Sequence, residues 1–270
     1  MIQQRHLIQG SRWVPSPTAK GAGLLMTATL SPPAHAVARS DPAARLHDYL
    51  EALRFYLSLP DETVDRILFV DNSAGDLGPL LALASGIDHA KQIEFISFAG
   101  NDHPIERGKA YGEFKLMDHG LANTTLFSAD DNVWKTTGRL KFLNLPDMVR
   151  AVTPRRFDFV CDLHNLPWIG SRHFSERQHM DLRVFAFRPS AYDAVLRGLW
   201  RQHDAGFDAK SLYRAMREAR GRFAVLPRFP IQAQLQGISG RHQRDYQSAA
   251  QRAKDDMRSW VRRYVPALWL

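Results

Sequence analysis

The feature that most restricts the fold is an uninterrupted apolar run, Ile67–Val70, followed at once by the polar segment Asp71-Asn72-Ser73. A strand that is apolar at every position is typical of a parallel sheet covered by helices on both faces. Similar strand patterns occur at Leu24–Leu30 and Ile93–Phe98, with helical patterns between them. The sequence therefore predicts an α/β protein with a Rossmann-like, mostly parallel sheet flanked by helices.

The remaining elements are predicted from capping residues and periodicity. Asp41 and Pro42 are a good N-cap and first helical residue for a helix that ends near Leu59. Residues 1–22 are polar and contain two prolines, which predicts a loose arm. Further helices are expected over 77–84, from Pro104 to Leu121 and from Pro189 onward, and further strands over 124–127, 157–161 and 182–187.

Charge is distributed unevenly along the chain, whose formal net charge is +8. Residues 1–196 hold 21 Lys and Arg against 22 Asp and Glu, whereas residues 197–270 hold 15 against 6. We therefore divide the chain into an arm (1–22), a near-neutral domain (23–196) and a basic helical region (197–270). A nucleic-acid-binding body is disfavoured by the near-neutral first part, and no nucleic acid partner is expected.

The cysteine count and the hydropathy exclude disulfide-rich, cysteine-zinc and membrane-spanning proteins. The single cysteine, Cys161, excludes a disulfide framework and a cysteine-based zinc site. No apolar run approaches the ~18–20 residues of a membrane span. A cytoplasmic protein is the default expectation.

Ligands of open α/β sheets bind beyond the carboxyl ends of the strands, so the polar residues at those ends are the first site candidates. Asp71, Asn72 and Ser73 follow a strand and suit recognition of a nucleotide's base or ribose. The same three residue types also cap helices well. The sequence favours neither interpretation.

Two basic segments could hold phosphate groups. Lys109 lies between two glycines of a predicted helix, but it could equally pair with Glu113 one turn later. The segment Lys135–Arg139, with sequence Lys-Thr-Thr-Gly-Arg, combines two cations, two hydroxyls and a glycine and suits a diphosphate. Composition alone favours an exposed basic turn for this second segment.

Two carboxylates are candidates for a general base. Asp162 and His164 project to the same side after a predicted strand, and either could accept a proton. Asp181 and Arg183 have the same spacing, with a structural ion pair as the alternative. The adjacent residues Asp130-Asp131 point to opposite sides of an extended segment, and no spacing typical of a metal site occurs, so no metal or other cofactor is expected.

Taken in order, the motifs over residues 23–200 resemble those of bacterial glycosyltransferases of the GT-A type that build capsule or O-antigen polysaccharides. The family usually has glycine where Ala110 stands. The matching segments are Thr27-Ala28-Thr29-Leu30-x-Pro32, Arg45 with Tyr49, Phe55-Tyr56-Leu57, Phe69–Ser73, Gly108-Lys109-x-Tyr111-Gly112-Glu113, Trp134-Lys135-x-Thr137-Gly138-Arg139 and Asp181-x-Arg183-x-Phe185.

The resemblance implies a nucleotide-sugar donor bound across the first strands and a glycan or lipid-linked acceptor. The Asp-x-Asp motif that holds a metal ion in most GT-A enzymes is absent, and we hypothesise that Lys135 and Arg139 neutralise the departing diphosphate instead. Asp162 and Asp181 are the candidate bases, and the sequence does not choose between them. The expected donor-binding residues are Thr27, Asp71, Asn72, Ser73, Lys109, Glu113, Lys135, Thr137, Gly138, Arg139 and Arg183.

The segment 243–264 predicts a basic amphipathic helix. Its apolar face suits either docking on the anionic inner face of the cell membrane or packing against the catalytic domain with the charges solvated. Packing is slightly favoured, because most amphipathic helices pack on their own protein.

Two other functions compete with glycosyl transfer. A sugar-phosphate nucleotidyltransferase could use a similar sheet, but its usual glycine-rich loop after the first strand is replaced by Ser31-Pro32-Pro33-Ala34-His35. A non-catalytic polyanion- or RNA-binding protein could use the basic region, which lacks the aromatic arrangement of a stacking platform.

Overall fold

The computed structural model describes residues 2–16, 21–33, 38–165, 178–202, 207–240 and 245–265, apart from the side chains of Ile105 and Lys109. The strands are β1 Ile2–Gln9, β2 Ala22–Ala28, β3 Val64–Asp71, β4 Gln92–Phe98, β5 Val133–Thr137, β6 Lys141–Phe142, β7 Phe159–Val160, β8 Leu163–His164, β9 His179–Met180, β10 Val184–Phe187, β11 Val225–Leu226 and β12 Leu235–Gln236. The helices are α1 Pro42–Ser58, α2 Gly78–Gly86, α3 Lys109–Asn123, α4 Leu145–Val152, α5 Pro189–Val195, α6 Ala209–Ala219 and α7 Ala249–Tyr264, with short 3-10 turns at Ile105–Arg107 and Leu199–Gln202.

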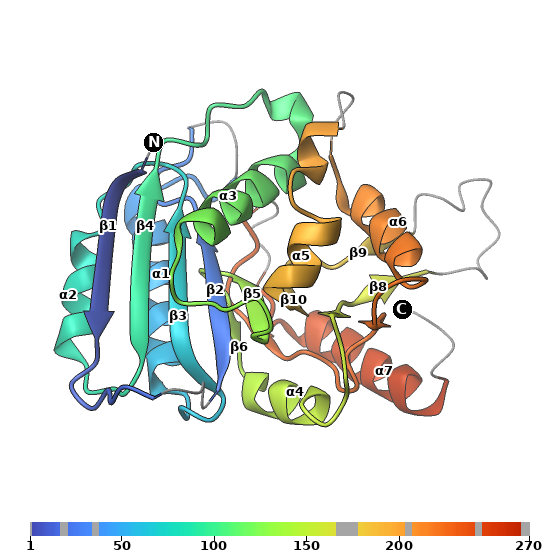
Figure 1. Cartoon of the computed structure of the whole chain (residues 1–270). Helices are drawn as coiled ribbons and strands as arrows, with labels where there is room; N and C mark the ends of the chain where they lie inside the picture. Colours follow the sequence, from blue (N-terminus) through green and yellow to red (C-terminus); the bar gives the residue numbers. More distant parts are fainter. Residues whose placement is uncertain are drawn as a thin grey trace.

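A mixed sheet organises the molecule, in the strand order β1-β4-β3-β2-β5-β10-β7-β11. The four strands β4, β3, β2 and β5 run parallel, whereas β1 and β10 pair antiparallel with the outer members of that group. Helices cover both faces, as Figure 1 shows, with α1 and α2 on one face and α3 and α5 on the other. The predicted α/β class with a mostly parallel sheet is confirmed.

The predicted first helix is confirmed in detail. Helix α1 starts at Pro42, and the Asp41 carboxylate accepts a hydrogen bond of 2.8 Å from the Ala44 amide. This bond satisfies one of the amides that a helix leaves free at its N-terminus. The buried face of α1 carries Tyr49, Leu53 and Tyr56, which pack against the sheet.

Three predicted elements differ from the structure. Residues 2–9 are not a loose arm, because they form the edge strand β1, where polar side chains can stay solvated. Residues 124–127 form no strand, and the strand that follows α3 is β5 at Val133–Thr137, whose five residues are buried and not an exposed basic turn. The helix predicted from Pro104 begins only after Gly108, because the φ of 81° at Gly108 is incompatible with a right-handed helix there.

The basic region makes contacts across the boundary drawn at residue 196. Strand β11 extends the main sheet beside β7, and β12 pairs with β6. Helix α7, drawn in red in Figure 1, lies on the opposite side of the molecule from α2. Within the described residues, no helix is long and apolar enough to cross a membrane.

Candidate functional site

The strand order changes direction between β2 and β5. The chain steps outward from β2 to β3 and β4, and α3 then carries it back to the other side of β2. Chains leaving the carboxyl ends of β2 and β5 diverge at such a switch point, which is where open α/β sheets bind ligands. Gly138 lies here, and its amide donates a 2.9 Å hydrogen bond to the Thr27 carbonyl. A Cβ atom at Gly138 would lie 2.9 Å from the same oxygen, so the close approach requires glycine.

Two buried arginines converge at the switch point. The side chains of Arg45 and Arg139 belong to residues that are only 4% and 8% exposed. Arg45 donates to the Thr29 carbonyl and to the Tyr49 hydroxyl, and Arg139 donates to the Ile238 carbonyl. All of these partners are neutral.

Neither arginine forms an ion pair with a carboxylate of the described residues. Arg39 forms a two-bond ion pair with Asp48, but in the described part of the chain no carboxylate lies within ion-pair distance of Arg45 or Arg139. Burial lowers the pKa of Arg139, and among the nearby groups Arg45 lowers it further, whereas Tyr49 and the Asp48 carboxylate raise it. Two neighbouring guanidinium groups in a poorly solvated place attract an anion, and a phosphate offers the acceptors that their forked donors need.

Beneath this point, Glu113 and Lys135 form a buried ion pair. The Lys135 ammonium is fully buried and donates to the Glu113 carboxylate and to the Leu182 carbonyl. Thr27 donates a 3.1 Å hydrogen bond to the same carboxylate. The direct contact of Lys135 with a diphosphate, expected from the sequence, is not the contact seen here, because the ammonium faces Glu113 instead of an open cleft.

Asp71, Asn72 and Ser73 hold the loops at the sheet's carboxyl edge. The fully buried Asp71 carboxylate accepts hydrogen bonds from Leu30, Ser73, Gly75 and Ser97. The helix-cap alternative is wrong, since α2 begins at Gly78 with no side-chain cap. Asp71 is committed to the loops, so base or ribose recognition stays a prediction that falls mainly to Asn72 and Ser73.

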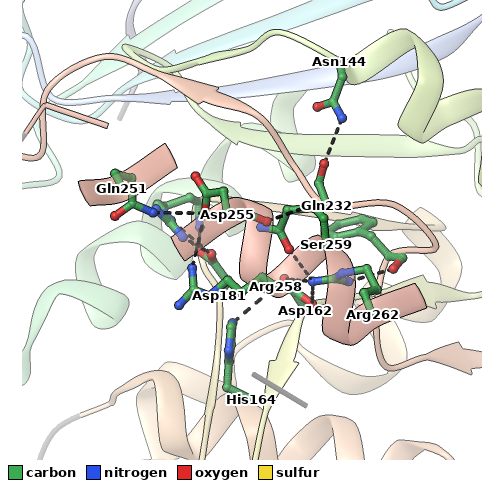
Figure 2. Close-up of polar contacts among 12 residues, drawn as sticks. Asn144, Asp162, His164, Asp181, Gln232, Gln251, Asp255, Arg258, Ser259 and Arg262 are labelled. Carbon is green, nitrogen blue, oxygen red and sulfur yellow. Dashed lines mark hydrogen bonds and ion pairs between the residues drawn. The ribbon is translucent and has the colours of Figure 1, made fainter. Parts of the chain in front are cut away.

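The two candidate bases come together on the far side of β5. The Asp181 amide donates a 2.9 Å hydrogen bond to the Asp162 carbonyl, and both carboxylates line one small cavity with His164 (Figure 2). The Arg183 guanidinium grips Asp181 in a forked ion pair, which holds the pKa of Asp181 well below its usual range despite burial. The structural ion pair proposed for these two residues is confirmed.

Asp162 forms its ion pair with an arginine of helix α7. The Arg262 guanidinium on α7 donates to both Asp162 oxygens at 3.0 Å, as Figure 2 shows. The His164 Nε2 atom lies 3.9 Å from the same carboxylate. Burial lowers the pKa of His164 to about 4, so the imidazole is neutral near pH 7. Its ring stacks on His179 with centroids 4.5 Å apart.

Helix α7 covers this cavity, which has a volume of only about 20 Å³. Gln251, Asp255 and Arg258 of α7 line it together with the two candidate bases. A sugar needs more room, so an acceptor can enter only if α7 or its neighbours move.

The arginine pair and the carboxylate cluster are neighbours. Tyr246 lies between them. The Arg183 guanidinium lies 5.1 Å from the centre of the Tyr246 ring, and the Tyr246 amide donates a hydrogen bond to the Gly237 carbonyl. The same short loop supplies the Ile238 carbonyl that holds Arg139. Thr137, at the end of β5, donates its amide to the Arg183 carbonyl at 2.9 Å. The structure thus gathers nearly all predicted site residues at one edge of the sheet.

Two residues of this site were not assigned from the sequence. Arg45 was matched to the family's motifs together with Tyr49 but was given no role, and its place as a cation in the buried stripe of α1 was a further signal. Arg262 had no local signal, because its partner lies 100 residues earlier in the chain. Lys109 was expected at the donor, but its side chain lies outside the described residues.

A larger cavity of about 260 Å³ lies at the opposite, amino end of β2 and β5. Its walls include Trp134 and Phe157, and Asp130 and Asp131 stand at its rim. We assign the candidate site to the switch point despite the smaller cavity there, since among the described residues this end of the sheet holds both the buried arginines and the candidate bases. Within the described residues, no three His, Cys, Asp or Glu side chains are grouped to hold a metal ion.

Comparisons with known proteins place no family on this chain. No protein-family model matches the sequence, and no curated protein shows significant similarity to it. Among solved structures, one similar chain is the crystal structure of 4-diphosphocytidyl-2C-methyl-D-erythritolsynthase from Anaerococcus prevotii. The TM-score is 0.48 at 9% identity, and the match covers 89% of this chain and 96% of that one. Likeness at this level carries no inference about activity, so membership of the glycosyltransferase family remains a proposal.

Proposed function

We propose that this chain is a glycosyltransferase that binds a nucleotide-sugar donor at the switch point between β2 and β5. One observation carries the proposal: Arg45 and Arg139 are both buried, close enough for the charge of Arg45 to act on Arg139, and neither forms an ion pair with a carboxylate among the described residues, beside a cluster of candidate bases. Such a pair favours a ligand with at least two negative charges, which a nucleoside diphosphate supplies.

In the proposed reaction, an acceptor hydroxyl attacks the anomeric carbon of the donor while the bond from that carbon to the diphosphate breaks. Negative charge grows on the departing diphosphate, and Arg45 and Arg139 stabilise it there. The hydroxyl proton passes to a carboxylate. The Glu113–Lys135 pair acts beneath the site, by fixing β5 against α3 and Thr27.

Asp162 is the base that the geometry favours. Asp181 is held by Arg183 from its own strand segment, and its lowered pKa makes it a weak proton acceptor. The partner of Asp162 comes from α7, a separate element whose departure would free the carboxylate. Loss of activity in Asp162→Asn with retained donor binding is the expected result.

The first experiment is a thermal-shift titration with UDP, GDP, CDP and dTDP and the corresponding nucleosides. We expect one diphosphate to stabilise the protein strongly, since a ligand at 100 times its Kd adds about 2.7 kcal/mol. In Arg139→Gln we expect its affinity to fall roughly 10- to 100-fold, the effect of losing a charge-assisted hydrogen bond of about 1.5–3 kcal/mol. Arg150→Gln is the matched control, because Arg150 is an exposed arginine on α4, whose residues Val149 and Val152 line the cavity at the opposite end of the sheet.

The outcomes separate the rival functions. Stabilisation by nucleoside triphosphates, with pyrophosphate released from a sugar phosphate reaction, would replace this proposal with a nucleotidyltransferase. A salt-dependent gel shift with nucleic acid and no response to any nucleotide would favour polyanion binding. Complete loss of activity in excess EDTA, restored by manganese or magnesium, would overturn the metal-independent form of the mechanism.

A further inference from the structure

Helix α7 is docked on the protein through its polar face. Gln251, Asp255, Arg258 and Arg262 fall on one line of the helix at 100° per residue, and this line faces the carboxylate cluster. Figure 2 shows Arg262 reaching Asp162, and the same guanidinium also donates to the Phe229 carbonyl at 2.7 Å. The expectation that the apolar face would pack inward with solvated charges is therefore wrong.

The opposite side of α7 is an apolar stripe in contact with solvent. Met257, Trp260 and Tyr264 recur at helical spacing and are 52%, 58% and 60% exposed. The rings of Trp260 and Tyr264 lie 5.4 Å apart and form one continuous surface. Ala250 and Ala253 extend the stripe toward the start of the helix and are exposed as well. We call these five residues the outer stripe.

Amphipathic helices of globular proteins normally turn their apolar side to the core. This helix has the reverse orientation, because its polar side is held against the protein by the bonds between Arg262 and Asp162. Large aromatic side chains gathered on an exposed face are typical of a surface that binds another protein, a ligand or a membrane.

Cations border the outer stripe on both sides. Arg252 and Arg263 lie on one flank and Lys254 on the other, all exposed, whereas Asp256 is the one exposed acid of this helix. Exposed aromatic residues framed by Lys and Arg suit the headgroup level of a bilayer, where rings enter the acyl boundary and cations meet anionic lipid. We propose that the outer stripe of α7 docks the protein on an anionic lipid bilayer.

The docking would bring the candidate site close to the lipid surface. The inner face of α7 lines the cavity with Asp162 and Asp181, so about one helix diameter, ~10 Å, separates that cavity from the bilayer. If the proposed function holds, an acceptor anchored in lipid is the class that this placement favours. Binding to the bilayer itself does not depend on the proposed function.

The experiment is cosedimentation of the full chain with vesicles of phosphatidylcholine, alone or mixed with phosphatidylglycerol. We expect binding to the mixed vesicles that salt weakens, and little binding to phosphatidylcholine alone. The double substitution Trp260→Ser/Tyr264→Ser should lower the partition coefficient at least tenfold. The triple substitution Arg252→Gln/Lys254→Gln/Arg263→Gln should lower it roughly 100-fold, since each cation near the surface contributes about fivefold.

The matched control is Leu7→Ser/Val14→Ser, which removes two equally exposed apolar residues far from α7 and should leave binding unchanged. Every substituted residue is exposed, and circular dichroism checks that each variant folds. Unchanged vesicle binding in the Trp260/Tyr264 variant would overturn the proposal, as would equal binding to both kinds of vesicle. A concentration-dependent dimer that this variant abolishes would show that a second copy covers the stripe, and would overturn it as well. A chain that binds vesicles but no nucleotide would refute only the proposed function.

Discussion

Several ionisable side chains in this protein are buried, and the way in which their charge is compensated differs among them. Lys135 is paired with Glu113, Asp181 is gripped by Arg183, and His164 stays neutral. Arg45 and Arg139 have carbonyl and hydroxyl partners. A buried cation whose direct hydrogen-bond partners are all neutral is the residue-scale feature that points to an anionic ligand.

The Glu113–Lys135 pair should be strongly coupled. Glu113→Leu or Lys135→Met alone is expected to cost about 3–5 kcal/mol of unfolding free energy, because each leaves one buried charge without its partner. The double variant Glu113→Leu/Lys135→Met should recover most of that loss. Urea unfolding of the four proteins measures the coupling.

A control pair is Asp147 and Arg150 on the surface of α4, for which a coupling below about 1 kcal/mol is expected. Equal coupling energies for the buried and the exposed pair would contradict the buried placement of Lys135.

His164 should make stability depend on pH. Its pKa of about 4 lies below the ordinary value of 6.5, so between these values the unfolded chain binds the proton more readily. Stability from this group is therefore complete above pH 6.5 and is lost as pH falls toward 4, at up to about 1.4 kcal/mol per pH unit. In His164→Gln, thermal unfolding should show a shallower pH dependence over this range. Other buried histidines also make stability depend on pH, so the slope of stability against pH is compared between His164→Gln and the wild type. Identical slopes would refute the lowered pKa of His164.

At the scale of elements, the position of α7 depends on one arginine. Arg262 links this helix to Asp162 and to the Phe229 carbonyl, and the inner face contributes few apolar contacts beyond Val261. The helix caps itself through Ser248, so it can keep its own structure while its docking changes.

Arg262→Met should loosen α7 without unfolding the sheet. Limited trypsin digestion is expected to cut within residues 249–264 sooner than in the wild type, while the remainder of the chain resists. Arg263→Met is the matched control, since Arg263 is the next residue and is exposed. Cleavage at the same rate in both variants would show that the Arg262–Asp162 contact does not hold the helix.

At the scale of the whole molecule, strand β1 closes one edge of the sheet. It pairs along β4, and Arg5 forms an ion pair of 2.6 Å with the buried Glu94. Removing it would expose the backbone donors and acceptors of β4, which are a template for pairing between molecules.

A truncation that starts the chain at Gly10 should therefore lower stability and cause association, measured by urea unfolding and light scattering across a concentration series. Leu7→Ala, which shortens an exposed side chain and leaves the strand in place, should have little effect. A truncated chain that stays monomeric and equally stable would contradict the edge role of β1.

The sequence by itself determined the local elements and most of the site's membership. Apolar runs predicted β2, β3 and β4, Asp41 predicted the start of α1, and polar residues after strands marked Asp71 and Asp162, whereas the segment ending in Arg139 was marked by its composition alone. These signals depend on residues a few positions apart, since helix and strand periodicity and capping are local effects.

Only the tertiary structure decided the pairing of distant groups. It set Lys135 against Glu113, gave Asp162 a partner from α7, added β1 to the sheet and turned the apolar face of α7 outward. Those outcomes depend on which strands become neighbours and on which charges must be compensated once water is excluded. The periodicity of residues along the chain gives no information about either.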